Sequence, residues 1–261
     1  MDKGISFYFG FANDIETRVA MIKDSGLNAV MTNADKKFDF QNGSIKKQCK
    51  LFKKYGLKVT SLHMQYNAED LPYFWKEGRF GEKLKKILIK DVKIAKKYGF
   101  KCVVVHLSGE YSSIGERRLK EVLNVCEKCN VPLAIENIHC QKLFLDTFDH
   151  IDHKMLRFCY DSGHNHAFDK DFDYLTKFAD KLICLHLHDN DGTEDQHNFN
   201  KFGNIDWDMI ARKLAGRTDL SLDYELLLPN EDYTIEECLK EVKKQADELE
   251  AKILKYSKSQ K

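Results

Sequence analysis

A recurring pattern of hydrophobic and polar positions divides the chain into alternating helices and strands. Lysine-rich amphipathic segments end at a glycine and lead into short apolar runs, as in DSGLNAVM (24–31), KKYGLKVTSL (53–62) and KKYGFKCVVV (96–105). A glycine just beyond a helix whose last turn carries lysines is typical of a helix C-terminus. The pattern predicts a last helix over 234–255 and strands near residues 5–9, 28–32, 57–63, 101–106, 132–136, 156–161, 181–187 and 219–225.

Eight strand–helix units in succession predict a closed parallel (β/α)8 barrel of the α/β class. The 261 residues suit one such barrel, and the three prolines mark no linker. We therefore expect a single domain over residues 1–261. A doubly wound open sheet is the alternative fold, but no G-x-G-x-x-G motif follows the first predicted strand.

Composition narrows the class of protein. The net charge of +1 does not favour a polyanionic partner such as nucleic acid, although a local basic patch is compatible with it. No stretch approaches the roughly 18 apolar residues of a membrane span, and the first residues lack the apolar core of a signal peptide. Eight cysteines without paired zinc-binding spacing fit reduced, buried thiols. We therefore expect a cytoplasmic protein with no membrane segment.

Ionisable residues gather where the predicted strands end. In a parallel barrel the carboxyl ends of the strands surround one point, and barrel enzymes carry out their chemistry there. A histidine or glutamate that ends a single strand is usually only a loop boundary, but six strands in a row argue for a shared site. The residues are His63, His106, Glu136, Asp161, His186 and Glu225.

The densest polar stretch is KLICLHLHDNDGTEDQHNFNKFGNIDW, over residues 181–207. Residues two apart on a strand share a face, so Cys184, His186 and His188 point the same way. A second pair, Asp195 and His197, follows in the loop. Imidazoles and carboxylates in this arrangement are typical of a divalent metal site. The alternative is a polar surface loop with incidental histidines.

A bound metal ion would also relieve the repulsion between carboxylates. Four carboxylates, from Glu136, Asp161, Asp195 and Glu225, would repel one another in a confined mouth without cations. Imidazoles beside them favour zinc, manganese or iron over magnesium or calcium. The candidate imidazoles are those of His63, His106, His164, His186 and His197.

The motifs VVVHLSGE, LAIEN, YDSGH and HLHDN…D-x-H…GNIDW, followed by Glu225, occur in this order along nearly the whole chain. With them the chain resembles the xylose-isomerase-like barrel superfamily. That superfamily contains sugar isomerases and epimerases, and also abasic-site nucleases of the endonuclease IV class. The resemblance implies a divalent-metal-dependent enzyme that isomerises or epimerises a small sugar, sugar phosphate or related polyol ketone.

The resemblance also assigns roles to residues. It implies that Glu136, Asp161, His186 and Glu225 hold one ion. In the epimerase-like branch the two glutamates flank the substrate carbon, where one removes a proton and the other returns it through a metal-stabilised cis-enediolate. His164 corresponds to a helper histidine that contacts the substrate or a metal.

A zinc-dependent phosphodiesterase of the endonuclease IV type is the alternative function. The further ligands of that branch correspond to His63, His106, Asp195 and His197, and all are present. The resemblance therefore implies one to three ions per chain, zinc or manganese. Scattered arginines and the lack of a long basic loop disfavour a nucleic-acid substrate without excluding it.

Three more residues are candidates for substrate contact. Lys201 replaces the first glycine of the family's G-x-G turn, where it could meet a substrate phosphate or be solvated. Trp75 lies in an irregular segment (65–81) that could form a sugar-stacking lid, a dimer contact or a small satellite core. His188, one pleat beyond His186, is expected to touch the substrate or support a ligand. Tyr8 and Phe9 could form an apolar wall or plain barrel core. Oligomeric state stays open, a homo-oligomer included.

Overall fold

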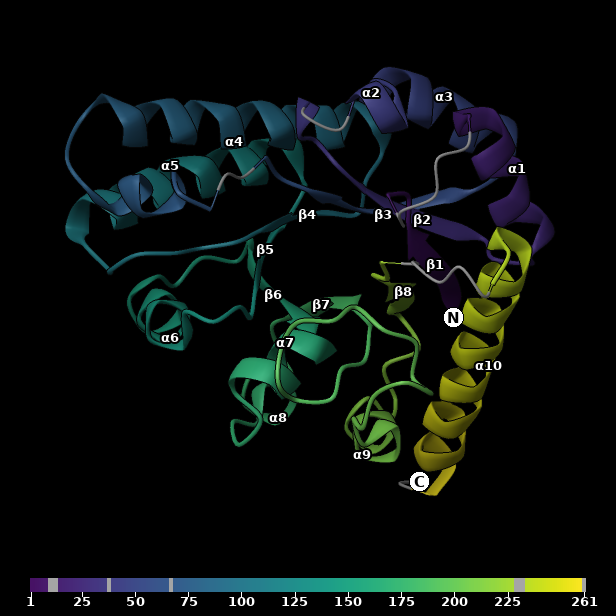
Figure 1. Ribbon diagram of the computed structural model, residues 1–261. Coiled ribbons are helices and arrows are strands. Elements are labelled where there is room, and N and C mark those ends of the chain that lie inside the picture. The colour runs from purple at the N-terminus through teal and green to yellow at the C-terminus, as the bar shows by residue number, and fades with distance from the viewer. Residues whose placement is uncertain (9–13, 37–38, 66–67, 228–232, 260–261) are drawn as a thin grey trace.

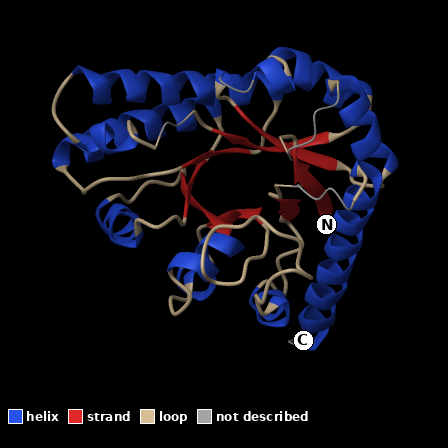
Figure 2. Cartoon of the chain, in the orientation of Figure 1, coloured by secondary structure: helices blue, strands red, loops and turns tan. Residues whose placement is uncertain are grey.

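The computed structural model describes residues 1–8, 14–36, 39–65, 68–227 and 233–259. Eight parallel strands form the wall of a barrel, with helices around it (Figures 1 and 2). The strands are β1 (Asp2–Ser6), β2 (Ala29–Asn33), β3 (Lys58–His63), β4 (Cys102–Val105), β5 (Leu133–Glu136), β6 (Leu156–Asp161), β7 (Leu182–His186) and β8 (Ser221–Tyr224).

The order of neighbouring strands, β7-β6-β5-β4-β3-β2-β1-β8, leaves β7 and β8 to meet. A bridge between Leu187 and Tyr224 joins them. Leu187 donates its N–H to the carbonyl of Asp223 at 2.9 Å, and Glu225 donates to the carbonyl of Leu187 at 3.0 Å. The predicted single-domain (β/α)8 barrel, also called a TIM barrel, is therefore confirmed.

Helices cover the outside of the strands (Figure 1). In α4, Leu88, Val92 and Ala95 form a buried stripe, and Gly99 ends the helix in the left-handed region at φ 79°. The helical elements are α1 (Ile15–Asp24), α2 (Asp39–Asn42), α3 (Ile45–Lys54), η2 (Leu71–Trp75), α4 (Arg79–Tyr98), α5 (Ser113–Cys129), α6 (Gln141–His150), α7 (Ser162–Phe168), α8 (Tyr174–Lys177), α9 (Trp207–Lys213) and α10 (Ile235–Ser259).

The first strand differs from its predicted position. Its bounds are Asp2–Ser6 and not residues 5–9. The reason is its pairing, because Asp2–Ile5 align with 221–224 and Gly4–Ser6 with 29–31. The other seven strands begin and end within two residues of the prediction.

The interior of the barrel is separate from the larger core between strands and helices. Cys102, Val104, Ala134, Cys159 and Cys184 form a buried cluster of their own. The larger core gathers apolar side chains of nearly every other described element. Side chains that end the strands therefore rest on a packed interior, and their positions are set by the barrel wall.

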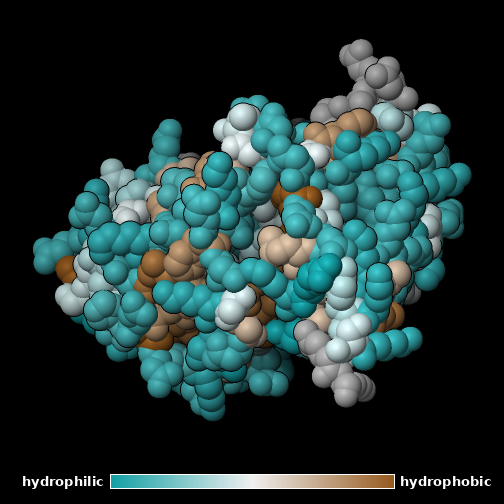
Figure 3. Space-filling model, turned by 90° about the horizontal axis from the view of Figure 1, so that it is seen from below, coloured by the Kyte–Doolittle hydropathy of each residue, from teal (hydrophilic) through white to brown (hydrophobic). Residues whose placement is uncertain are grey.

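The outer surface is mostly polar. Figure 3 shows one predominantly hydrophilic face, on which apolar atoms appear between polar side chains. Within the described ranges, no helix is long and apolar enough to span a membrane.

Candidate metal centre

A cavity of about 120 Å³ opens at the carboxyl ends of the strands. It brings together side chains from both ends of the chain, because the carboxyl ends of the strands and the loops that follow them meet at this point. The lining residues are Tyr8, Asn33, Asp35, His63, Met64, His106, Glu136, His164, Asp195, His197 and Glu225.

Glu136, the last residue of β5, lies at the centre of the polar groups and is 1% exposed. Its Oε2 lies 3.1 Å from Nδ1 of His186 and 3.2 Å from Nε2 of His106. Its Oε1 lies 3.2 Å from Nδ1 of His164. Burial by itself would raise the pKa of Glu136, but His186 and His106 outweigh it and hold the pKa well below its usual range.

Potential metal donors form three groups at the mouth, and the donor atoms within each group lie within 4.8 Å of one another. Glu136 belongs to two of the groups and would bridge them. Such spacing suits ligands that each stand about 2.0–2.3 Å from a shared ion. The groups are His63, His106 and Glu136; then Glu136, Asp161, His186 and Glu225; then His164, His188, Asp195 and His197.

The arrangement of nitrogens fits a cation. Nε2 of His63 and Nε2 of His106 face each other across 3.2 Å, and both approach the same oxygen of Glu136. Both oxygens of Glu136 and both ring nitrogens of His186 are buried, and Nδ1 of His186 lies close to the carboxylates of both Glu136 and Glu225. Buried imidazoles and carboxylates this close together fit the coordination of a divalent ion.

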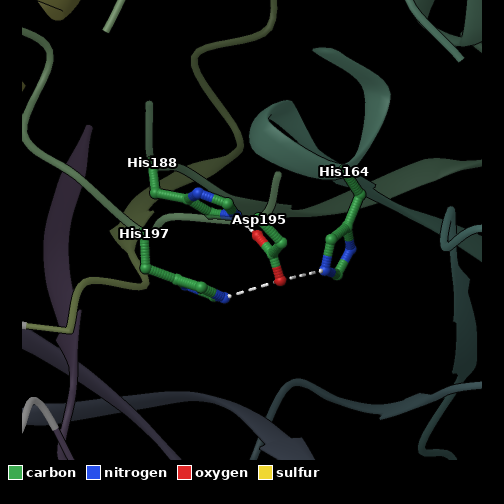
Figure 4. A group of neighbouring side chains, drawn as sticks. All are labelled: His164, His188, Asp195 and His197. Carbon is green, nitrogen blue, oxygen red and sulfur yellow. Dashed lines mark hydrogen bonds and ion pairs between the residues drawn. The ribbon is translucent and has the colours of Figure 1, made fainter. Parts of the chain in front are cut away.

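The third group surrounds Asp195 (Figure 4). Oδ2 of Asp195 lies 3.3 Å from Nε2 of His164 and 3.1 Å from Nε2 of His197. The His197 ring stacks on His188 with centroids 4.0 Å apart. Burial would lower the pKa of His197, but Asp195 and Glu225 raise it to about 9.

Neighbouring groups orient the donors. Nδ1 of His197 hydrogen-bonds to the carbonyl of Glu225 at 2.7 Å, which turns Nε2 toward the mouth. Oδ1 of Asn137 accepts the N–H of Asp161 at 2.8 Å, while its Nδ2 donates to the Asp161 carbonyl at 2.9 Å. Sequence analysis gave Asn137 no role, although it lies inside the motif LAIEN. The feature of the sequence that could have identified Asn137 is an amide side chain directly after a buried strand.

Comparison with known proteins identifies the family. Residues 19–248 match the model of the xylose isomerase-like TIM barrel family. The chain belongs to the xylose isomerase-like TIM barrel family. The fold and the resemblance that the sequence predicted are therefore confirmed.

Individual relatives in the family are more distant. An uncharacterised Sinorhizobium fredii protein, y4fM, is 31% identical over 117 residues, which are 41% of this chain and 38% of that protein. The chain thus spans less than half the length of this curated relative. A D-tagatose 3-epimerase-like protein has a TM-score of 0.78 at 18% identity, covering 100% of this chain and 99% of the other. D-psicose 3-epimerase from Clostridium cellulolyticum H10 has a TM-score of 0.70 at 16% identity and covers 99% of both chains.

The family motif GNIDW holds the loop that carries Asp195 and His197. Asp189 accepts hydrogen bonds from the N–H of Ile205 at 3.1 Å and from Nε1 of Trp207 at 2.5 Å. A Cβ on Gly203 would stand 1.9 Å from Oδ1 of Asp189. Gly203 is the second glycine of the family's G-x-G turn, whose first glycine is replaced by Lys201. Gly203 is therefore the glycine that the loop requires for steric reasons.

His188 lies beside two carboxylates of the site, in keeping with the expectation that it supports a ligand. The side chain is completely buried, and its Nε2 lies 3.0 Å from Oδ1 of Asp161 and 3.6 Å from Oδ1 of Asp195. As a member of the third donor group, it lies next to Asp195 and His197. A Cβ on Gly163 would collide with its ring at 1.8 Å, so this glycine makes room for it.

Trp75 is not a lid over the mouth. It is 3% exposed and packs against α5, where a Cβ on Gly115 would stand 2.1 Å from Cε3 of the indole. Buried Arg118 fixes the segment by donating to the carbonyls of Phe74 and Lys76, both at 2.7 Å. Trp75 therefore belongs to the large hydrophobic core and not to a satellite core.

Lys201 lies outside the cavity. Its Nζ is 3.2 Å from the hydroxyl of Tyr233 and 4.6 Å from the centroid of that ring, with Phe202 on another side. The ammonium group thus lies among the aromatic rings of Phe202 and Tyr233, and a contact with a substrate phosphate stays a prediction.

Tyr8 makes a polar contact and is not simply part of an apolar wall. Its hydroxyl donates to Oε1 of Glu225 at 2.6 Å, and its ring lines the cavity. Phe9, which was predicted to accompany it, lies outside the described residues.

Proposed function

We propose that the protein is a divalent-metal-dependent isomerase or epimerase of a small carbohydrate, with Glu136 and Glu225 as the proton-transferring groups. The observation that carries the proposal is the convergence of these two carboxylates on one imidazole. Oε2 of Glu136 and Oε2 of Glu225 lie 3.1 Å and 2.8 Å from Nδ1 of His186. Two bases at one small cavity suit removal of a proton from one face of a carbon and its return to another.

Both glutamates can accept a proton at neutral pH. Burial would raise the pKa of Glu225, but His186 outweighs it and holds the pKa well below its usual range, as for Glu136. Removal of one proton from the carbon next to a carbonyl leaves one negative charge on the former carbonyl oxygen, beside the neighbouring hydroxyl. A divalent ion held by Glu136, Asp161, His186 and Glu225 would supply the compensating positive charge.

The size and lining of the cavity support a small polar substrate. A volume of about 120 Å³ is below the range of roughly 300–1,000 Å³ that is typical of larger ligands. Asn33 and Asp35 line it beside the metal donors and offer amide and carboxylate groups to hydroxyls. The sugar epimerases among the solved neighbours support the same substrate class.

The three donor groups favour a second candidate, a zinc phosphodiesterase of the endonuclease IV type. Glu136 shared between two groups, with the third group adjacent through Asp161 and His164, suits a cluster of three ions. The described lining of the cavity includes no lysine or arginine to hold a nucleic-acid backbone. We therefore rank this candidate second.

Solvent isotope exchange tests the proposal. The metal-loaded protein should incorporate deuterium from D2O into a member of a panel of ketoses, and Glu136→Gln and Glu225→Gln should each abolish this. Asp180→Asn, at an exposed carboxylate, is the matched control and should exchange as the wild type does. Metal content is measured for every variant, so that loss of the ion is separated from loss of the base.

Two results would reverse the ranking. Exchange that persists in both glutamine variants would remove the glutamates from proton transfer. Cleavage of an abasic-site duplex that is lost in His63→Ala and His106→Ala, without exchange into any ketose, would establish the phosphodiesterase.

A further inference from the structure

Three cysteines lie together inside the barrel, one layer below the mouth. Cys102 is on β4, Cys159 on β6 and Cys184 on β7, and they are 3%, 0% and 5% exposed. With Val104 and Ala134 they form the interior cluster, which is separate from the larger core. A cysteine in a core usually serves as a small apolar residue. Three cysteines clustered below a group of metal donors suggest that their sulfurs could themselves bind a metal.

Strand register places two of these sulfurs directly below metal donors. Cys159 and Cys184 are aligned partners on neighbouring strands, and so are Asp161 and His186. Because residues two apart share a face, each cysteine lies one step deeper in the barrel than the donor on its own strand. The thiols and the mouth therefore adjoin along the barrel axis.

The donor atoms of Cys159, Cys184 and His186 all lie within 4.8 Å of one another. An ion that stands about 2.3 Å from each sulfur can join sulfurs up to about 4.6 Å apart. The two sulfurs therefore need to move only a little to bind the same ion. Nδ1 of His186 faces the two glutamates, which leaves Nε2 for a second partner. Cys102 belongs to the same buried cluster, so its thiol adjoins these donors.

We propose that Cys159, Cys184 and Nε2 of His186 form a second metal site, the thiol pocket, which takes a thiophilic ion such as Cd(II) or Cu(I). Soft thiolates select soft ions, whereas the carboxylates and imidazoles of the mouth suit harder divalent ions. Each thiol that binds the ion loses its proton to solvent, so uptake releases protons. The proposal does not depend on the reaction at the mouth, although His186 links the two sites.

The experiment uses the full-length chain, reduced, freed of metal and refolded in the presence of Cd(II), since the pocket is buried in the folded state. Thiolate ligation gives an ultraviolet sulfur-to-cadmium charge-transfer band and a downfield cadmium-113 resonance. Cys126 and Cys129 on α5 are spaced to bind Cd(II) as well, so the reference protein is Cys126→Ser/Cys129→Ser. We expect the reference protein to give both signals, with one thiolate-bound ion per chain.

Variants then locate the ion. Cys159→Ala and Cys184→Ala, made in the reference protein, should each lose most of the band, while Cys49→Ala on α3 should keep it. Circular dichroism shows whether each variant folds. The cadmium-113 resonance of the reference protein needs no further substitution, so a variant that fails to fold leaves the test intact. A reference protein with no thiolate signal, or a band unchanged in the Cys159 and Cys184 variants, would overturn the proposal.

Discussion

The hydroxyl of Tyr8 donates a 2.6 Å hydrogen bond to Oε1 of Glu225, which joins the end of the first strand to the end of the last. The other oxygen of Glu225 lies 2.8 Å from Nδ1 of His186. Tyr8 therefore holds the carboxylate in one rotation about its final bond. It is a positioning residue for the glutamate that we propose transfers a proton.

Tyr8→Phe should lower kcat about tenfold and leave KM nearly unchanged, because it removes orientation of the base and no substrate contact. The measurement is the rate of solvent deuterium exchange once a substrate has been found. Tyr111→Phe, which removes a 2.5 Å hydrogen bond to Glu116 away from the cavity, is the matched control. Equal rates in the two variants would contradict the role given to Tyr8.

Arg118→Met should destabilise the protein by about 3–5 kcal/mol, because it leaves several buried carbonyls without a donor. Arg118 is 2% exposed and also pairs with Glu82, whose Oε1 lies 2.9 Å from its Nε. Its neighbour Arg117 is 65% exposed, and its pair with Glu82 measures 3.8 Å. Arg117→Met is therefore the control, with an expected change of about 0.5 kcal/mol or less in urea unfolding.

Gly115→Ala should destabilise the protein by about 1–3 kcal/mol, against the preference of helices for alanine. The added Cβ would stand 2.1 Å from the indole of Trp75, which has no room to withdraw. Unfolding in urea measures the change. A stabilised variant would mean that Trp75 can move out of the core. The alternative in which Trp75 acts as a lid over the mouth would then be possible again.

Asp91 should make stability depend on pH. Burial raises its pKa to about 7, against 3.8 for an ordinary aspartate. A raised carboxyl pKa favours the folded state only while the group is protonated, so this contribution is present below about pH 4 and is lost as the pH rises to about 7. Asp91→Asn keeps an acceptor for the N–H of Gln65 and carries no charge.

The gain of Asp91→Asn over the wild type should therefore be near zero at pH 4, grow toward pH 7 and stay constant above it. Three pKa units set an upper bound of about 4 kcal/mol. Urea unfolding across this range measures it, with Asp180→Asn as an exposed control. A flat difference would show that the carboxylate is ionised in the folded protein at no cost.

His188→Asn should weaken the binding of the ion held around Asp195 by about 10–100-fold, because it removes support from Asp161 and Asp195. Metal per chain after dialysis against a graded chelator is the measurement. His150→Asn, on an exposed side chain at the end of α6, is the control. Equal retention of metal in both variants would separate His188 from the metal centre.

Sequence periodicity determined the fold and most of the mouth. Alternating helices and strands dictate a parallel barrel, and such a barrel brings strand ends together whatever its loops do. For this reason Glu136, Asp161, His186 and Glu225 could be grouped from the sequence, although they are far apart along the chain. The same pattern predicted seven of the eight strands to within two residues of their bounds.

Only the tertiary structure decided what depends on contacts between distant segments. The pairing of Asp2–Ser6 with β2 and β8 moved the first strand, although ISFYF is the more apolar run. Trp75 became core because Arg118 and Gly115, on another helix, fix and receive it. His188 and Lys201 were placed by partners that no local pattern identifies. Local sequence sets which face a side chain takes, whereas its neighbours across the barrel determine whether it meets solvent, substrate or a metal.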